Sequence, residues 1–151
     1  MRLQKIDVKA VSAAPPGAVY ALLRDGATWP TWSPIGSFSL DREGEHEREG
    51  LGAIRIFRTG RTRSCERIVE LVPDRRLSYV LLSGLPIRGY RADVDLEPNG
   101  DGTTIHWHST FKGKVPGTGW FYRRALTSFI GRTARGLAEH AAANAGIPQP
   151  A

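Results

Sequence analysis

Cysteine is almost absent from the chain. Cys65 is the single cysteine, so no disulfide can form within the chain and no pair of thiolates is available to a metal. Long apolar runs are also missing: no stretch approaches the roughly 18 residues of a membrane-spanning helix, which predicts no stable membrane insertion. The opening residues, 1–7, alternate charged and apolar side chains and lack the apolar centre of a secretory signal. These absences predict a cytoplasmic protein.

Motifs of common enzyme classes are missing as well. The glycine-rich segment 113–119 lacks the terminal Gly-Lys-Ser/Thr of a phosphate-binding loop. No Ser-His-Asp or Cys-His arrangement is visible in a recognisable local motif. His106 and His108 stand two apart on one face of a strand-like segment, a spacing that can hold a metal, but the sequence offers no clear third ligand. We therefore predict no metal and no cofactor, with both histidines on the outer face of a sheet.

Acidic residues are outnumbered by basic ones, and the net charge is +6 with an isoelectric point near 10.0. Such a charge suits nucleic acid or an anionic membrane only if it is concentrated on one face. The arginines between residues 55 and 76 instead alternate with Glu66, Glu70 and Asp74, and no basic run is longer than two residues. The pattern predicts a solvated, arginine-rich sheet surface and no nucleic-acid partner.

The 151 residues are most simply one domain, which we expect to span 1–145, followed by a frayed tail over 146–151. Alternating apolar residues predict antiparallel strands, and two short helical patterns follow the first of them. The expected order is strand 3–13, helices near 16–23 and 27–32, strands near 35–43, 51–58, 61–72, 77–82, 90–97 and 104–111, and a long helix from about 118 to 145.

The long C-terminal helix has an amphipathic pattern that indicates where a cavity lies. At one hundred degrees per residue, one arc carries aromatic, aliphatic and small polar residues, while arginines and Glu139 lie opposite. That mixture is typical of a small-molecule cavity. The predicted buried arc consists of Tyr122, Leu126, Phe129, Thr133, Gly136, Leu137 and His140.

The order of elements and three local segments resemble the SRPBCC superfamily of START-like and polyketide cyclase/dehydrase-like proteins. The segments are 29–34 (WPTWSP), 66–73 (ERIVELVP) leading into 77–79, and 102–107 (GTTIHW) before the last helix. The resemblance implies an α+β helix-grip fold, in which a seven-stranded antiparallel sheet wraps around the long C-terminal helix over an elongated apolar cavity. It does not imply one activity, because the fold hosts carriers, receptors and cyclases.

The strand phases and the helix arc select candidate ligand-binding residues. The predicted inward phases of three strands carry Tyr79, Tyr90 and Trp107, each with a polar group that a dry core would have to satisfy. Asp93 and Asp95 fall on the opposite, outward phase. For Glu66 and Arg67 the inward phase stays open, and the inward member would pair with a charge or orient a ligand oxygen. The full predicted set is Trp32, Tyr79, Tyr90, Trp107, Tyr122, Leu126, Phe129 and Thr133.

The function hypotheses follow from that cavity. The first is binding or transport of a hydrophobic or aromatic small molecule, lipid-like or polyketide-like, which needs no catalytic residue. The alternative is a polyketide cyclase/dehydratase in which Tyr79, Arg67 or His140 assists enolisation or loss of water. A third is an interaction module with a filled interior. The sequence leaves open which of these applies, the identity of the ligand, the catalytic residues and the oligomeric state.

Overall fold

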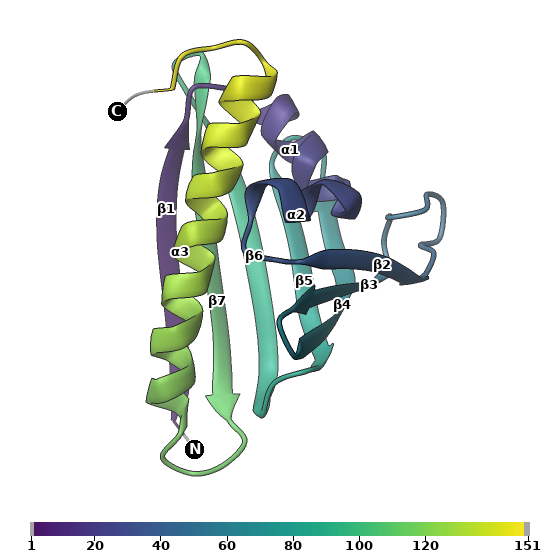
Figure 1. Ribbon diagram of the computed structural model, residues 1–151, viewed down its shortest axis with the longest axis vertical. Helices are drawn as coiled ribbons and strands as arrows, with labels where there is room; N and C mark the ends of the chain where they lie inside the picture. The colour runs from purple at the N-terminus through teal and green to yellow at the C-terminus, as the bar shows by residue number, and fades with distance from the viewer. Residues whose placement is uncertain (1, 150–151) are drawn as a thin grey trace.

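The protein forms a strongly curved antiparallel sheet around one long helix in the computed structural model, which describes residues 2–149 (Figure 1). The strands follow the order β1-β7-β6-β5-β4-β3-β2, and every neighbouring pair is antiparallel. The predicted helix-grip fold, with seven strands, a long C-terminal helix and short helices after the first strand, is confirmed.

The elements start and end close to the positions that the sequence pattern predicts. The strands are β1 (Leu3–Ser12), β2 (Ser37–Arg42), β3 (Ile54–Thr59), β4 (Thr62–Val72), β5 (Arg76–Ser83), β6 (Ile87–Asn99) and β7 (Gly102–Gly113). The helices are α1 (Pro16–Arg24), the short 3-10 turn η1 (Gly26–Thr28), α2 (Trp29–Trp32) and α3 (Gly119–Asn144).

Tight turns set the register of the sheet. Thr59 pairs with Thr62 across β3 and β4, so the turn between them contains only Gly60 and Arg61, and Gly60 has a φ of 58° that suits glycine. Register shifts interrupt the pairing of β4 with β5 on both sides of residues 66–68. These bulges explain why the inward phase of β4 could not be read from simple alternation.

Helix α3 runs along β1 and β7 (Figure 1). The side chains of its two halves are buried to different extents. In the predicted arc, Thr133 and Leu137 are buried, whereas Tyr122, Leu126 and Phe129 are only half-buried. The fully buried face of the second half instead consists mainly of small residues: Gly131, Ala134, Ala138, Ala141 and Ala142, together with Ile130. Small side chains allow the helix to lie close to the sheet, so the predicted aromatic arc is only partly correct.

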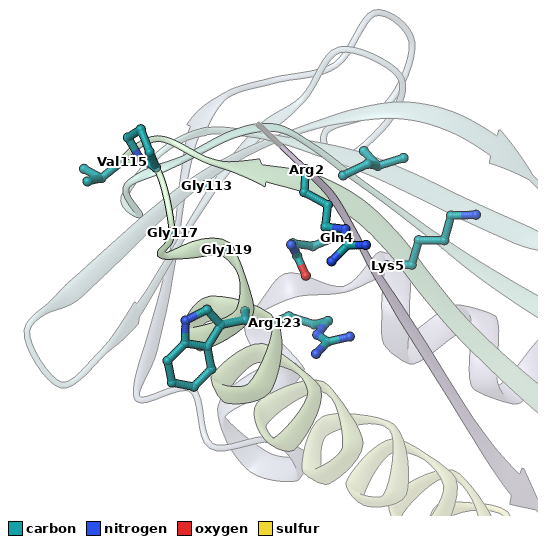
Figure 2. A pocket seen from close by; sticks show the side chains of 11 residues that line it. Arg2, Gln4, Lys5, Gly113, Val115, Gly117, Gly119 and Arg123 are labelled. Carbon is teal, nitrogen blue, oxygen red and sulfur yellow. The ribbon is translucent and has the colours of Figure 1, made fainter.

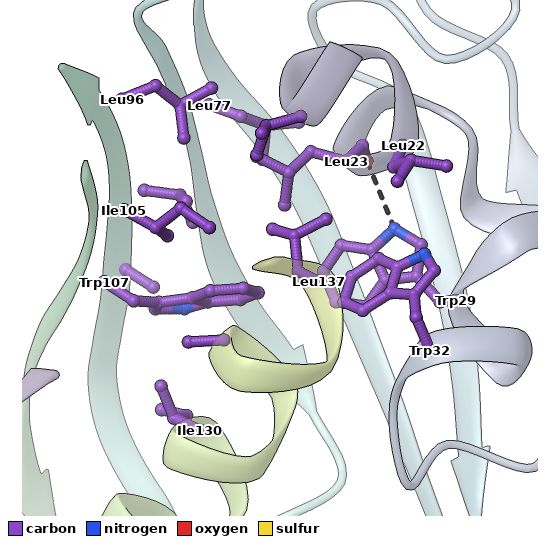
Figure 3. Packing of buried hydrophobic residues seen from close by; sticks show 14 of the residues in the cluster. Leu22, Leu23, Trp29, Trp32, Leu77, Leu96, Ile105, Trp107, Ile130 and Leu137 are labelled. Carbon is purple, nitrogen blue, oxygen red and sulfur yellow. Dashed lines mark hydrogen bonds between the residues drawn. The ribbon is translucent and has the colours of Figure 1, made fainter. Parts of the chain in front are cut away.

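The core beside that half of α3 is built around tryptophans (Figure 3). Trp29 and Trp32 are 2% and 5% exposed, and their ring centroids lie 4.8 Å apart. Trp29 also meets the edge of Trp107 at 5.8 Å. A Cβ atom on Gly136 would lie 1.8 Å from the carbonyl oxygen of Trp32. Glycine at position 136 therefore lets α2 contact α3.

The end of the chain contacts the first strand. The Gln149 side chain donates to the Val11 carbonyl at 2.6 Å and accepts from the Ala13 amide at 2.7 Å. These two bonds link Gln149 to the end of β1, while the frayed tail over 146–151 stays a prediction because Pro150 and Ala151 lie outside the described residues. None of the helices within residues 2–149 combines the length and apolar character needed to cross a membrane.

Candidate functional site

A small cavity lies between the concave face of the sheet and α3. Its volume is about 40 Å³, which is room for two or three water molecules at roughly 10–15 Å³ each. The predicted elongated cavity is therefore wrong for this conformation, because large aromatic rings fill most of the interior. The lining residues are Trp29, Ile35, Phe57, Thr59, Ser64, Glu66, Tyr79, Trp107, Phe129, Ile130 and Thr133.

One wall of the cavity is an aromatic cluster. Trp29 from α2 stacks on Phe57 from β3 with ring centroids 4.6 Å apart. Trp107 from β7 donates its indole N–H to the Tyr79 hydroxyl at 3.2 Å, so the polar atoms of these two side chains partly satisfy each other. Rings held in this way form a rigid apolar wall of the kind that binds ring-shaped or aliphatic ligands.

Glu66 carries the one carboxyl group among the polar groups that line the cavity, which also include the hydroxyls of Thr59, Ser64, Tyr79 and Thr133. Its Oε1 atom is fully buried and has no hydrogen-bond partner. The structure thus resolves the open phase of β4: Glu66 faces the cavity and Arg67 is exposed. Burial raises the pKa of Glu66 to about 7, and the positive charge of Arg55 opposes that rise only in part. The carboxyl group is therefore protonated in a large fraction of molecules near neutral pH.

Arg55 is the cation closest in register to this carboxyl group, since it pairs with Glu66 across β3 and β4. Its side chain is 0% exposed, donates to the Leu23 carbonyl at 2.9 Å and lies 3.4 Å from Glu49. The guanidinium group also lies over the Trp29 and Phe57 rings, 5.1 and 5.2 Å from their centroids. The prediction that Arg55 belongs to a solvated surface is wrong, because β3 is buried where α1 and the 45–50 loop cover it.

Two inward tyrosines extend the polar side of the site. Burial raises the pKa of Tyr79 and raises that of Tyr90 to about 12, so both hydroxyls stay protonated at neutral pH. Their rings lie 6.2 Å apart, and Phe111 follows 6.0 Å beyond Tyr90. These hydroxyls can donate or accept hydrogen bonds but do not supply a base at neutral pH.

The predicted ligand-binding residues divide into two groups. Tyr79, Trp107, Phe129 and Thr133 line the cavity. The others lie outside its lining: Trp32 is packed beneath Trp29 and donates to the Thr28 hydroxyl at 3.0 Å, Tyr90 points inward farther along β6, and Tyr122 and Leu126 lie on the half-buried part of α3. The contribution of all eight to ligand binding stays a prediction.

Several cavity residues were not identified from the sequence. Trp29 and Phe57 form the stacked wall. Ile35, which follows α2, and Ile130 of α3 also line the cavity. Trp29 lies in the WPTWSP segment, so that segment could have identified it. Phe57 had no comparable signal, because β3 has buried residues on both of its faces.

On the outer face, β6, β7 and β1 bring histidines and carboxylates together. His106 and His108 do face outward, as predicted, and their rings stack with centroids 4.4 Å apart. The Asp95 carboxylate lies 2.6 Å from Nε2 of His108, so the structure supplies the third candidate metal ligand that the sequence lacked. Arg76 already pairs with both oxygens of Asp95, at 2.6 and 3.1 Å, and so balances its charge.

Comparison with known proteins places the chain in a family. Residues 4–145 match the family described as polyketide cyclase / dehydrase and lipid transport. The chain belongs to that family. No curated protein sequence matches the chain.

Solved structures share the fold at low sequence identity. A START superfamily protein from Mycobacterium smegmatis has a TM-score of 0.80 at 13% identity, covering 93% of this chain and 98% of its own. TTHA0849 from Thermus thermophilus has a TM-score of 0.74 at 19% identity, covering 93% of this chain and 99% of its own. Ara h 8.0201 has a TM-score of 0.73 at 17% identity, covering 95% of this chain and 100% of its own. These similarities concern the fold alone.

Proposed function

We propose that the protein binds a hydrophobic or aromatic small molecule, lipid-like or polyketide-like, between the sheet and α3. The observation that carries the proposal is an aromatic-walled cavity with one buried, unpaired carboxyl group, the combination of apolar surface and few polar atoms that ligand sites use. Family membership supports the same assignment. The cytoplasmic location predicted from the sequence belongs to this proposal.

A ligand of ordinary size needs more room than the cavity offers, because small-molecule sites occupy roughly 300–1,000 Å³. The half-buried first part of α3 is where that room can arise, since Tyr122, Leu126 and Phe129 are less firmly buried than the residues after them. We therefore expect ligand binding to move this part of the helix away from the sheet. Apolar packing against the ligand then takes the place of packing between the helix and the sheet.

The experiment fills the cavity from the helix side. Phe129→Trp adds ring atoms where Phe129 lines the cavity, and Ser128→Trp is the matched control at the neighbouring exposed position of α3, outside the lining. The probes are Nile red and a thermal-shift panel of fatty acids and aromatic polyketides. A ligand at a hundred times its Kd raises stability by about 2.7 kcal/mol. We expect Phe129→Trp to weaken binding at least tenfold and Ser128→Trp to retain it. Equal binding by both variants would contradict the proposed site.

A second function, cyclisation and dehydration of a poly-keto chain, is favoured by one observation: Glu66 faces the cavity beside Tyr79. The Glu66 carboxylate would accept the proton from the carbon between two carbonyl groups. The resulting enolate carbon would form the new bond at a third carbonyl carbon, and protonated Glu66 would return the proton to the alkoxide. Glu66→Gln should then abolish turnover of a poly-keto thioester while leaving its binding intact. Unchanged turnover would leave only the carrier function.

A further inference from the structure

One end of the molecule combines exposed apolar side chains with cations. At this end, the segment 113–123 and the first residues of β1 enclose a groove of about 820 Å³. Figure 2 shows Arg2 and Gln4 on one side of the groove and Arg123 on the other. We call the following residues the basic-aromatic end: Arg2, Leu3, Lys5, Lys112, Lys114, Val115, Trp120, Phe121, Arg123 and Arg124.

The apolar members of this end are unusually exposed for their size. Trp120, Phe121 and Val115 are 56%, 55% and 54% exposed, and Leu3 is 49% exposed. The Trp120 and Phe121 rings touch edge to face, with centroids 6.2 Å apart, and so form one projecting aromatic pair at the start of α3. Large apolar groups gathered at one end of a protein mark a contact surface for another apolar phase or partner.

The charges around these groups all have one sign. Between Asp101 and Glu139 the chain has no acidic residue, and Lys112, Lys114, Arg123 and Arg124 all fall in that stretch and are exposed. The first turn of α3 also lacks an acidic residue and a capping side chain, so the positive end of the helix dipole is not neutralised there. On the outer face of the sheet, by contrast, the arginines are paired with carboxylates. Arg76 and Arg91 form ion pairs there with Glu70, Asp93 and Asp95.

We propose that the basic-aromatic end docks the protein on the surface of an anionic lipid bilayer. Tryptophan and phenylalanine partition into the headgroup boundary, while lysine and arginine are attracted by anionic lipids, so the two residue classes act together at such a surface. This inference rests on the proposed function, because a carrier of hydrophobic molecules exchanges them with a bilayer. Docking is peripheral, which agrees with the lack of a membrane-crossing helix within residues 2–149.

Trp120 makes the inference directly measurable. Of the four tryptophans, Trp29, Trp32 and Trp107 are buried, so a change in fluorescence on docking reports on Trp120. The protein is mixed with vesicles of phosphatidylcholine alone or of equal parts phosphatidylcholine and phosphatidylserine. We expect sedimentation with the anionic vesicles only, a blue shift of emission, and quenching by brominated lipid chains. Raising the salt concentration should release the protein.

Three variants test which surface is responsible. Lys114→Glu with Arg123→Glu should lower partitioning by well over tenfold, since each cation near an anionic bilayer contributes about fivefold. Trp120→Ser should lower it and remove the blue shift. Arg61→Glu with Arg63→Glu changes the net charge equally in the exposed β3–β4 hairpin and is the control, expected to retain binding. All variants should take up Nile red in solution as the unchanged protein does.

The outcomes separate this inference from the proposed function. If neither vesicle sediments the protein at low salt, or if the hairpin variant loses binding as strongly as the Lys114 and Arg123 variant, the docking surface is wrong even when Nile red uptake persists. The inference would also be wrong if the protein bound an oligonucleotide more tightly than the anionic vesicles and the Lys114 and Arg123 variant lost that binding. The partner of this end would then be nucleic acid. Loss of Nile red uptake in Phe129→Trp with normal vesicle binding would leave the docking surface in place.

Discussion

At the scale of single residues, Glu66 is the most consequential side chain. Its side chain is half-buried and faces the cavity, and its Oε1 atom is fully buried without a hydrogen-bond partner. A charged carboxylate in this position is costly, and the neutral acid is less so. Retaining such a group in an apolar cavity lowers stability, which fits a group that meets a polar atom of a ligand.

The destabilisation caused by burying the Glu66 carboxyl group should be measurable as a pH dependence of the free energy of unfolding. Because its folded-state pKa is raised from 4.5 to about 7, the folded state binds more protons than the unfolded state between those values. Stability of the unchanged protein therefore falls as pH rises through this window, by up to about 1.4 kcal/mol per pH unit. Glu66→Gln stays neutral, so its advantage should grow from pH 4.5 to about 7 and then level off.

Urea unfolding at several pH values measures this effect. Glu97→Gln, at an exposed carboxylate on β6, is the matched control and should follow the unchanged protein throughout. If Glu66→Gln showed no greater advantage above neutrality than in mild acid, then Glu66 would be satisfied in the folded protein and would not be a free polar group of the cavity.

At the scale of elements, the close approach of α2 to α3 depends on small residues in α3. Gly136 lies against the carbonyl oxygen of Trp32, and the buried face around it is made of alanines. Trp29 lies in the same short helix as Trp32 and stacks on Phe57. The cavity wall is therefore positioned by a backbone contact that no side-chain pattern displays.

Two glycines on α3 provide a matched pair of substitutions. Gly136→Ala would place Cβ 1.8 Å from a backbone oxygen, so we expect it to destabilise the protein by about 2 kcal/mol or more. Gly131→Ala meets only the flexible end of Arg135 at 3.4 Å and gains helix propensity, so we expect stabilisation of up to about 1 kcal/mol. Thermal and urea unfolding give both values. Equal effects of the two changes would mean that α2 does not constrain α3.

At the scale of the whole molecule, the C-terminal half of α3 is well buried and the N-terminal half is not. Residues 130–142 supply nearly all of its buried positions, and Ser12 donates to the Ala138 carbonyl at 2.7 Å. Residues 120–129 are exposed or half-buried and lead to the basic-aromatic end. The loosely held half of the helix thus joins the cavity to the proposed membrane surface.

Hydrogen exchange should reveal this division. Amides of residues 123–129 should exchange faster than those of residues 130–142, because local opening costs less where few apolar contacts are broken. Ligand binding should slow exchange in the first segment more than in the second. Uniform protection along α3 would contradict an entrance at this half of the helix and would place ligand access elsewhere.

Local sequence patterns were enough to predict the fold class and most of the strand phases. Alternation across β6 and β7 placed Trp107 and Tyr90 inward and both histidines outward, because side-chain direction in a regular strand depends only on position. The order of elements and the three family-like segments determined the rest of the architecture. Strand alternation and the order of elements depend on residues that are close in the sequence, so both can be predicted from the sequence alone.

The interior of the site and its surroundings could be seen only once the chain was folded. A register shift at Val69 changes the phase of β4 beyond Glu66 and Ile68, and covering segments buried Arg55, neither of which alternation can show. Asp95 joined the two histidines from a neighbouring strand. The cavity's small volume reflects rings from α2, β3 and β7, which lie far apart in the chain and meet only in the fold. Distances between such segments depend on packing, so they are decided in three dimensions.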